Sequence, residues 1–193
     1  FNISLKKDAS AKYNSFEFGG GFVRNDIHTY FDAPNGDCEI NSLFIPNGSQ
    51  HIDISTIVHH KSPHCSSRQL VKGILGGNSR AVFRGLANVY KEAGKTDARQ
   101  NNKNLILAPS ARVNSIPQLE IYEDDVKCSH GSTTGQIEEE ALFYLQSRGI
   151  NRTDAMELMV RGFANEVVDK VENQDMKKYI QNSLIQKMEG MVQ

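Results

Sequence analysis

The chain has 193 residues, enough for one large domain or for a domain with a helical appendix. Its 22 basic and 23 acidic residues give a formal net charge of -1, which excludes the basic stripe of a dedicated nucleic-acid binder. No apolar run approaches the roughly 20 residues that a transmembrane helix needs, so we expect no membrane-spanning segment. The sequence starts at Phe1 without an initiator Met or the apolar core of a signal peptide, and we expect a piece of a longer chain.

Residues 1–135 are expected to form β-strands. Apolar residues tend to alternate with polar ones in short segments separated by turn residues, which is typical of strands with one buried face. No helical pattern intervenes, so the fold class is mainly β, and a sandwich, a barrel and a β-helix remain open. Small polar residues around single apolar positions at 78–85 and 109–115 suit the coils of a β-helix, although no strict repeat is visible. The strand-like segments are 15–18, 37–45, 51–56, 69–75, 81–83, 104–107 and 118–122.

After Gly135 the pattern becomes helical, which predicts a small helical domain over residues 136–193 attached to a β core over residues 1–135. A first helix should stop at Gly149, and Asn151 should cap a second one. A third should cover Asp175 to Met188. The apolar faces are Ile137, Ala141, Leu142 and Leu145 in the first helix; Met156, Met159, Val160, Phe163, Ala164, Val167, Val168 and Val171 in the second; and Tyr179, Ile180, Leu184, Ile185 and Met188 in the third.

The segment HHKSPHC at 59–65 holds three histidines and a cysteine, a candidate site for zinc or iron. Its spacing is poor, because His59 and His60 point to opposite faces of an extended segment and Pro63 turns the chain before His64. The alternative is a polar corner with one or two buried, hydrogen-bonded histidines. The cysteines of the whole chain are odd in number and form no CxxC pair, which indicates neither a disulfide framework nor a structural zinc site.

Cys128 and His130 lie two residues apart in the stretch DVKCSHGSTTG at 125–135. We expect Asp125 to His130 to form the last strand, and Gly131 to Gly135 to lead the chain into the helices. Strand residues i and i+2 face the same side, so the thiol and the imidazole could share a ligand or favour a thiolate beside an imidazolium. Both residue types are also common in purely structural positions, and no nucleophile elbow or phosphate-binding loop accompanies them.

Two long motifs, LEIYEDDVKCSHGSTTG at 119–135 and LFYLQSRGI at 142–150, carry a family resemblance. Together with VFRG at 82–85 and PHCSSR at 63–68, they resemble the SufB/SufD family, the non-ATPase subunits of the SUF iron–sulfur cluster assembly machinery. The resemblance covers the chain from about Ile52 to its C-terminus. Ser129 and Gly131 stand where SufB-type chains carry acidic residues, and Asn101 stands where they carry a cysteine, so the SufD form is indicated.

This resemblance implies a right-handed parallel β-helix with a C-terminal helical domain. It also implies a non-catalytic scaffold that pairs with a SufB-like paralogue, or with a second copy of itself when alone, while the helical domain binds a SufC-like ATPase. Cys128 and His130 match family positions near the pairing surface, where they would be metal ligands of an iron–sulfur cluster held transiently at the interface. Arg148, Gly149 and Ile150 join two helices within a family motif and are the predicted contacts with the ATPase.

One alternative from a different class is a β-helix enzyme that acts on a polysaccharide. Such an enzyme needs clustered carboxylates or basic residues along one exposed sheet, whereas the acidic residues here are scattered or lie in helices. Analogy of fold alone is a weak argument for it. We therefore expect no enzymatic activity, no cofactor bound firmly by this chain, and a location in the reducing cytoplasm.

Overall fold

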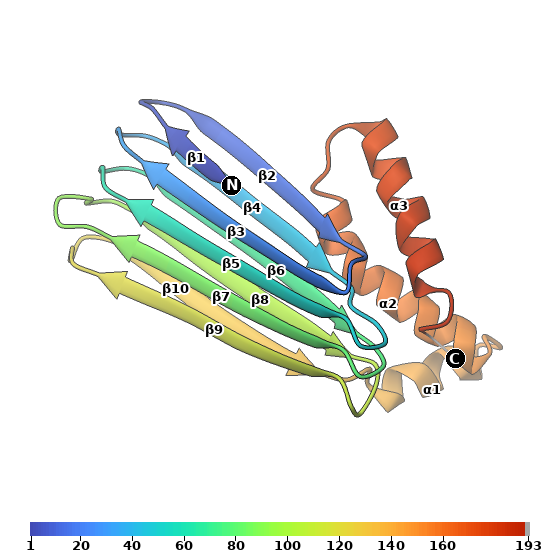
Figure 1. Cartoon of the computed structure of the whole chain (residues 1–193). Coiled ribbons are helices and arrows are strands. Elements are labelled where there is room, and N and C mark those ends of the chain that lie inside the picture. The colour runs from blue at the N-terminus through green and yellow to red at the C-terminus, as the bar shows by residue number, and fades with distance from the viewer. Residues whose placement is uncertain (192–193) are drawn as a thin grey trace.

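The structure is a computed structural model that describes residues 1–191, and it consists of ten strands followed by three helices (Figure 1). The strands are β1 (Asn2–Leu5), β2 (Ser10–Glu17), β3 (Phe22–Phe31), β4 (Asp37–Phe44), β5 (His51–His60), β6 (Ser66–Leu75), β7 (Arg80–Val89), β8 (Asp97–Ile106), β9 (Arg112–Ile121) and β10 (Lys127–Gly135). The helices are α1 (Glu139–Ser147), α2 (Arg152–Val168) and α3 (Gln174–Met188).

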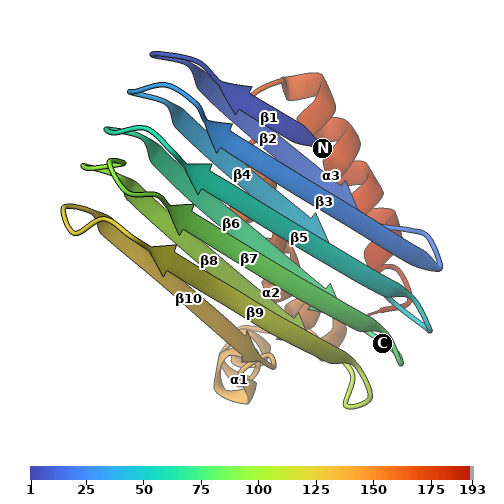
Figure 2. The ribbon, with the colours of Figure 1, turned by 60° about the vertical axis from the view of Figure 1, so that its left-hand side comes forward.

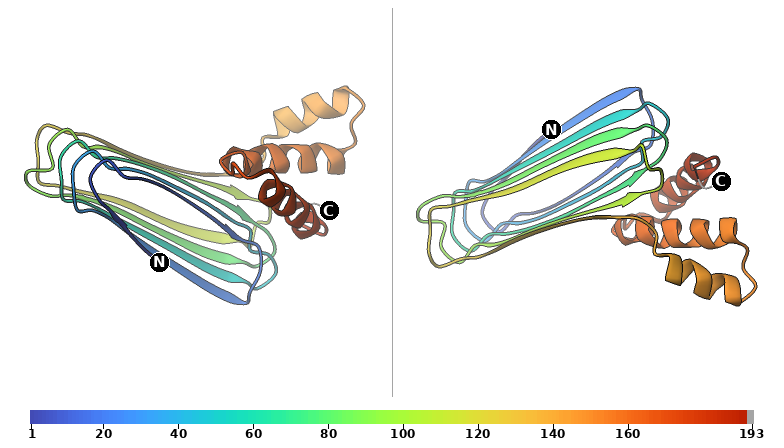
Figure 3. Two further views of the ribbon diagram at one scale, coloured as in Figure 1. Left: turned by 90° about the horizontal axis from the view of Figure 1, so that it is seen from above. Right: turned by 90° about the horizontal axis from the view of Figure 1, so that it is seen from below.

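Successive strands alternate between two parallel sheets, so the chain winds as a β-helix of five turns (Figure 2). Sheet A has the order β1-β3-β5-β7-β9, and sheet B has the order β10-β8-β6-β4-β2. Seen end-on, the two sheets enclose a flattened lumen (Figure 3). The prediction of a parallel β-helix is therefore confirmed, while the sandwich and the barrel are excluded.

The lumen is filled by the alternate side chains of each strand that point inward. Apolar residues fill most of it, and they gather in two clusters of buried side chains. One contains Phe44, Ile52, Ile54, Val71, Leu75, Ala81, Phe83 and Ala111. The other contains Leu5, Ile27, Phe31, Cys38, Ile40, Val58 and Cys65. Because each strand supplies only a few inward residues, the hydrophobic pattern of any one segment is short.

The helices pack on the outer face of sheet B, over the C-terminal parts of several of its strands (Figure 1). Leu43, Ile74 and Leu105 of the sheet share a buried cluster with the apolar stripes of α2 and α3. The predicted stripe of α2 is confirmed at Val160, Ala164, Val167 and Val168. The prediction for α3 is wrong at Tyr179, which is 69% exposed because only Ile180, Leu184 and Met188 face the cluster.

Local signals end the helices where the sequence predicts. Gly149 has a positive φ of 87° just after α1, a conformation that glycine adopts without steric penalty. The side chain of Asn151 accepts a hydrogen bond from the backbone N–H of Asp154 at the start of α2. No helix within residues 1–191 is long and apolar enough to cross a bilayer.

A buried lysine ties the helices to the β-helix. Lys72 points outward from β6, and its side chain is 2% exposed. Its Nζ donates to Glu166 Oε2 at 2.5 Å and to the carbonyl of Phe163 at 2.7 Å, and it lies 3.8 Å from the centroid of the Phe163 ring. The position of α2 on sheet B thus depends on one ion pair as well as on apolar packing.

Candidate functional site

The candidate site lies on β10, the last strand of sheet B. β10 pairs with β8 from Lys127↔Asp97 to Gly135↔Leu105, and no other strand within residues 1–191 pairs with its other side. The expectation that Gly131 to Gly135 lead the chain away from the β core is wrong, because these residues continue the strand to its end. The ladder with β8 imposes this extended conformation on a run of small polar residues that has no strand pattern of its own.

β9 and β10 together form the open edge of the β-helix, defined here as the unpaired outer sides of both strands. Each is the last strand of its sheet, and both belong to the final turn (Figure 2). Cys128 is the one residue of β10 that is half-buried, while the other eight are exposed. The backbone N–H of Lys127 bonds to Thr96 on the β8 side, so the N–H groups of even-numbered residues, such as Cys128 and His130, point toward the open edge.

The inward side chains of β10 are Cys128, His130, Ser132 and Thr134. Ser132 shows this direction, since its hydroxyl donates to Ser115 Oγ of β9 at 2.8 Å. Strand alternation then places Cys128 and His130 on the same, lumen-facing side, as the sequence predicts. They lie at the exposed mouth of the lumen rather than in its interior.

The ionisation of Cys128 differs from the sequence-based expectation. Burial raises the pKa of its thiol, the nearby charge of Asp97 acts in the same direction, and a backbone hydrogen bond at Ala98 opposes them. The thiol is therefore protonated at neutral pH in the chain by itself. Of the two possibilities that the sequence left open, a stabilised thiolate is not supported by this raised pKa, and it would require a cation or metal from elsewhere.

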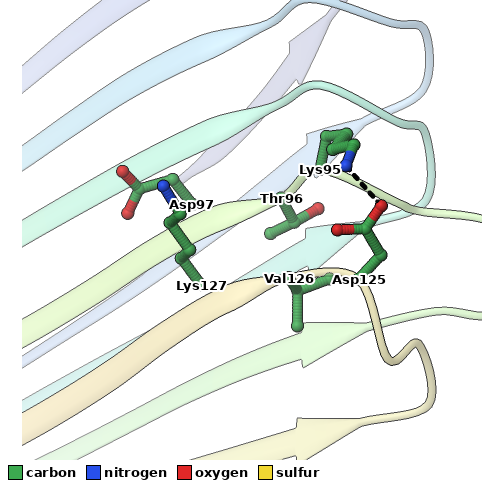
Figure 4. Close-up of a pocket in the computed structure, with 6 residues that line it drawn as sticks. All are labelled: Lys95, Thr96, Asp97, Asp125, Val126 and Lys127. Carbon is green, nitrogen blue, oxygen red and sulfur yellow. Dashed lines mark ion pairs between the residues drawn. The ribbon is translucent and has the colours of Figure 1, made fainter.

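A shallow, charge-lined cleft adjoins the start of β10 (Figure 4). Lys95 and Asp125 face each other across it, with Lys95 Nζ 2.6 Å from Asp125 Oδ2. Both side chains are about 60% exposed, so this pair adds little stability. The cleft ends at Lys127, next to Cys128, and it places a mixed-charge rim beside the candidate site.

The histidine-rich segment at 59–65 is dispersed by the fold. His59 lies on the outer face of sheet A, stacked on Tyr30 with ring centroids 4.8 Å apart. His60 points into the lumen, fully buried, with its Nε2 2.9 Å from Ser67 Oγ. No three His, Cys, Asp or Glu side chains within residues 1–191 are grouped to hold a metal ion. The metal site is therefore not supported, and the alternative of a buried, hydrogen-bonded histidine is confirmed.

Arg148, Gly149 and Ile150 form the connection between α1 and α2. Arg148 lies over the ring of Tyr144, 5.3 Å from its centroid, and its Nη2 donates to the Tyr144 hydroxyl at 3.2 Å. Next to this loop Phe143 is 73% exposed and Tyr144 is 57% exposed, so the connection borders an aromatic surface. Sequence reasoning missed these two aromatics. The available signal was their position outside the apolar stripe of α1, which leaves large apolar side chains exposed.

Gln100 of β8 is a second residue that sequence reasoning missed. It is the Cα partner of His130, one turn deeper in the lumen, and it is 3% exposed. A polar residue at an inward strand position was the available signal, but it is visible only once the face of the strand is known.

Comparison with known proteins shows the family to which the chain belongs. Residues 1–163 match the family model described as "SUF system FeS cluster assembly, SufBD core domain". The chain belongs to the SufBD family. The resemblance seen in the motifs is thereby confirmed, and its β region extends to the start of the chain.

Relatives of the SufBD chain support the SufD form. The chain is 41% identical to the iron-sulfur cluster assembly protein SufD of Escherichia coli over 189 residues. This alignment covers 98% of this chain and 45% of the relative. A SufBD family protein of Mycobacterium leprae is 37% identical over 175 residues, covering 86% and 45%. The SufD of Plasmodium falciparum is 27% identical over 187 residues, covering 95% and 13%. The chain thus spans less than half the length of these relatives.

Proposed function

We propose that this chain is a non-catalytic scaffold for iron–sulfur cluster assembly that pairs through its open edge with a SufB-like paralogue. The observation that carries the proposal is the final turn of the β-helix, where two strands lack a partner on one side and present Cys128 and His130 at the mouth of the lumen. Membership of the SufBD family supplies the biochemical setting, iron–sulfur cluster assembly.

The composition of β10 supports pairing at this edge. Natural sheets protect exposed edges with charges, proline or short strands, because unpaired N–H and C=O groups recruit other strands. β10 is nine residues long, and after Lys127 it contains no lysine, arginine, acidic residue or proline. The β9 side of the open edge carries Pro117, but the β10 side is unprotected over this length and is expected to be covered, by the paralogue or, when the chain is alone, by a second copy of itself.

Cys128 and His130 would supply two of the ligands for a cluster bound transiently at this interface. They are too few to hold a cluster without other donors, so the remaining ligands would come from the paired subunit. The protonated thiol of Cys128 suits a site that is complete only on pairing, because a bound metal would displace its proton. Three free cysteines also suit a reducing compartment such as the cytoplasm.

The aromatic surface of α1 is the proposed contact with a SufC-like ATPase. Phe143 and Tyr144 are large side chains that remain exposed, and Tyr144 lines a hollow together with Ala141, Leu145 and Met159 and, at its rim, Glu138 and Glu140. Exposed aromatics next to an apolar hollow are typical of protein–protein contacts. The predicted contacts Arg148, Gly149 and Ile150 border this surface, with Arg148 holding the ring of Tyr144.

A polysaccharide-active enzyme receives no support from the structure. The buried carboxylate on the outer face of sheet A, Asp53, accepts hydrogen bonds from Arg84 at 3.0 Å and from Arg24 at 3.4 Å. A carboxylate whose oxygens accept hydrogen bonds from two guanidinium groups is already occupied, which does not suit an acid catalyst.

Pairing is tested by changing a single backbone donor at the open edge. Thr134→Pro removes an N–H that points away from β8, so the ladder within sheet B survives, whereas Thr134→Val keeps that N–H and serves as the control. We expect Thr134→Pro to lose co-purification with the SufB-like paralogue while Thr134→Val keeps it. Equal capture of both variants would contradict pairing through this edge.

Binding of the ATPase is tested on the helices. Phe143→Glu should abolish capture of the SufC-like ATPase and leave pairing with the paralogue intact. Tyr179→Glu, an equally exposed aromatic on α3, is the matched control and should change neither. If both variants capture the ATPase like the wild type, α1 is not the contact surface.

The role of the site itself is tested by cluster formation in the reconstituted complex. His130→Ala should lower the cluster yield without disrupting the complex, because it removes a ligand but keeps the strand. An unchanged yield would make His130 a structural residue.

A further inference from the structure

Gln100 is a buried amide that lacks hydrogen-bonding partners. Its side chain is 3% exposed, and neither Nε2 nor Oε1 is paired with any group within residues 1–191. Buried polar side chains are nearly always hydrogen-bonded, because desolvation without compensation is unfavourable. The unpaired donor Nε2 and acceptor Oε1 of Gln100 therefore need a structural or functional explanation.

The position of Gln100 links it to His130. β8 and β10 pair in parallel register with Gln100 opposite His130, and adjacent strands lie about 4.8 Å apart. Both residues are on the lumen-facing side, since Gln100 Oε1 lies 3.3 Å from the point where a Cβ on Gly85 of sheet A would stand. Gln100 thus lies directly beneath His130 in the ladder, and its amide is in the lumen.

At the mouth of the lumen, the polar side chains next to Gln100 are already occupied. Asn102 donates to the carbonyl of Val71 at 3.0 Å and accepts from Ser115 at 2.7 Å. Gln69, the Cα partner of Gln100 one turn deeper, accepts at Oε1 from Thr56 Oγ1 at 2.6 Å, while its Nε2 is unpaired within residues 1–191. Beneath Cys128 the register places Ala98, which has no polar side chain. The unused hydrogen-bonding capacity at the mouth of the lumen is therefore concentrated under His130.

We propose that Gln100 is a positioning residue for His130. When the imidazole turns toward the lumen, the unpaired amide oxygen accepts the N–H of the ring nitrogen nearer to it, and this hydrogen bond selects the tautomer whose lone pair points out of the mouth. Histidines that bind metal commonly have their second nitrogen held in this way, which fixes ring orientation and raises basicity. This inference rests on the proposed role of His130 as a ligand donated across the open edge.

The contact itself is tested in the chain without any metal, by ring nitrogen NMR of ¹⁵N-histidine-labelled protein. His130 is assigned by the signals that disappear in His130→Asn. We expect one tautomer of His130 in the wild type, and a mixture of tautomers in Gln100→Leu. Gln69→Leu is the matched control, because it removes a buried amide one turn further from His130, and it should leave the His130 signals unchanged.

The functional consequence is tested by Fe²⁺ binding to the complex with the SufB-like paralogue under anaerobic conditions. Gln100→Leu should weaken Fe²⁺ affinity about 10- to 100-fold, the usual effect of losing a residue that orients a ligand, while Gln69→Leu stays within about twofold. Gln100→Asn, whose shorter side chain cannot reach the ring, provides a second variant that keeps the lumen polar and should behave like Gln100→Leu.

These outcomes separate the inference from the proposed function. Unchanged His130 signals in both Gln100 variants overturn the positioning role, whatever the iron measurements show. A tautomer change with no loss of iron affinity also overturns it, because the orientation that Gln100 gives to His130 then has no effect on iron binding. If His130→Ala has a normal cluster yield while the tautomer still depends on Gln100, the proposed ligand role of His130 fails and the contact alone survives.

Discussion

Exchange of Glu166 for Ala should destabilise the fold more than exchange of Lys72 for Met, although each removes one half of the same ion pair. The two side chains differ in burial, since Lys72 is 2% exposed and Glu166 is 45% exposed. Burial lowers the pKa of Lys72, and the hydrogen bond and charge of Glu166 oppose this shift. Burial alone would raise the pKa of Glu166, but hydrogen bonds from Lys72 and Lys103 lower it overall.

The magnitudes follow from what each change leaves behind. Glu166→Ala leaves a buried ammonium with only the carbonyl and ring of Phe163, and an uncompensated buried charge costs about 3–5 kcal/mol. Because the pair lies near the surface, we expect about 2–3 kcal/mol. Lys72→Met removes the charge together with its desolvation, and Glu166 keeps Lys103 at 3.2 Å, so we expect about 0–1 kcal/mol.

The free energy of unfolding is measured by urea titration with far-UV circular dichroism. Lys103→Met is the control, because its side chain is 34% exposed and an exposed pair contributes less than about 1 kcal/mol. Equal losses for Glu166→Ala and Lys72→Met, or a larger loss for Lys72→Met, would refute the reasoning from burial.

Three further predictions concern the lumen and its mouth. Burial lowers the pKa of His60 from 6.5 to about 4, so between these pH values only the unfolded chain gains a proton. The free energy of unfolding should therefore fall by up to about 3 kcal/mol as the pH drops from 6.5 to 4. Urea unfolding of His60→Gln should lack this pH dependence. Gly73→Ala should lower the free energy of unfolding by about 1–3 kcal/mol, because the new Cβ would overlap the ring of Phe44. The control Gly131→Ala meets open space and should change stability by less than about 0.5 kcal/mol. Equal melting temperatures of the two variants would contradict this. Alkylation of Cys128 by iodoacetamide should still accelerate above pH 9, since its pKa is raised from 9.0, and a rate that levels off near neutral pH would reveal a thiolate instead.

Local sequence was sufficient for the helices. A cap such as Asn151 and a terminating Gly149 act within one turn of helix, and the stripe of α2 repeats often enough to stand out. The same holds for the family, because its motifs are continuous stretches of sequence. The predicted face of α3 was wrong at Tyr179, because the sequence of one helix does not say which neighbouring surface the helix will meet.

The site depended on contacts that local sequence does not encode. Gly131 to Gly135 have no strand pattern, and they are extended because they pair with β8, one turn earlier in the chain. The separation of His59 from His60, the place of Gln100 beneath His130, and the open edge of β10 all follow from the stacking of turns. Alternation along a strand tells which residues share a face, but which face is the lumen and which strand comes last are decided only when whole turns bury their inward side chains against one another.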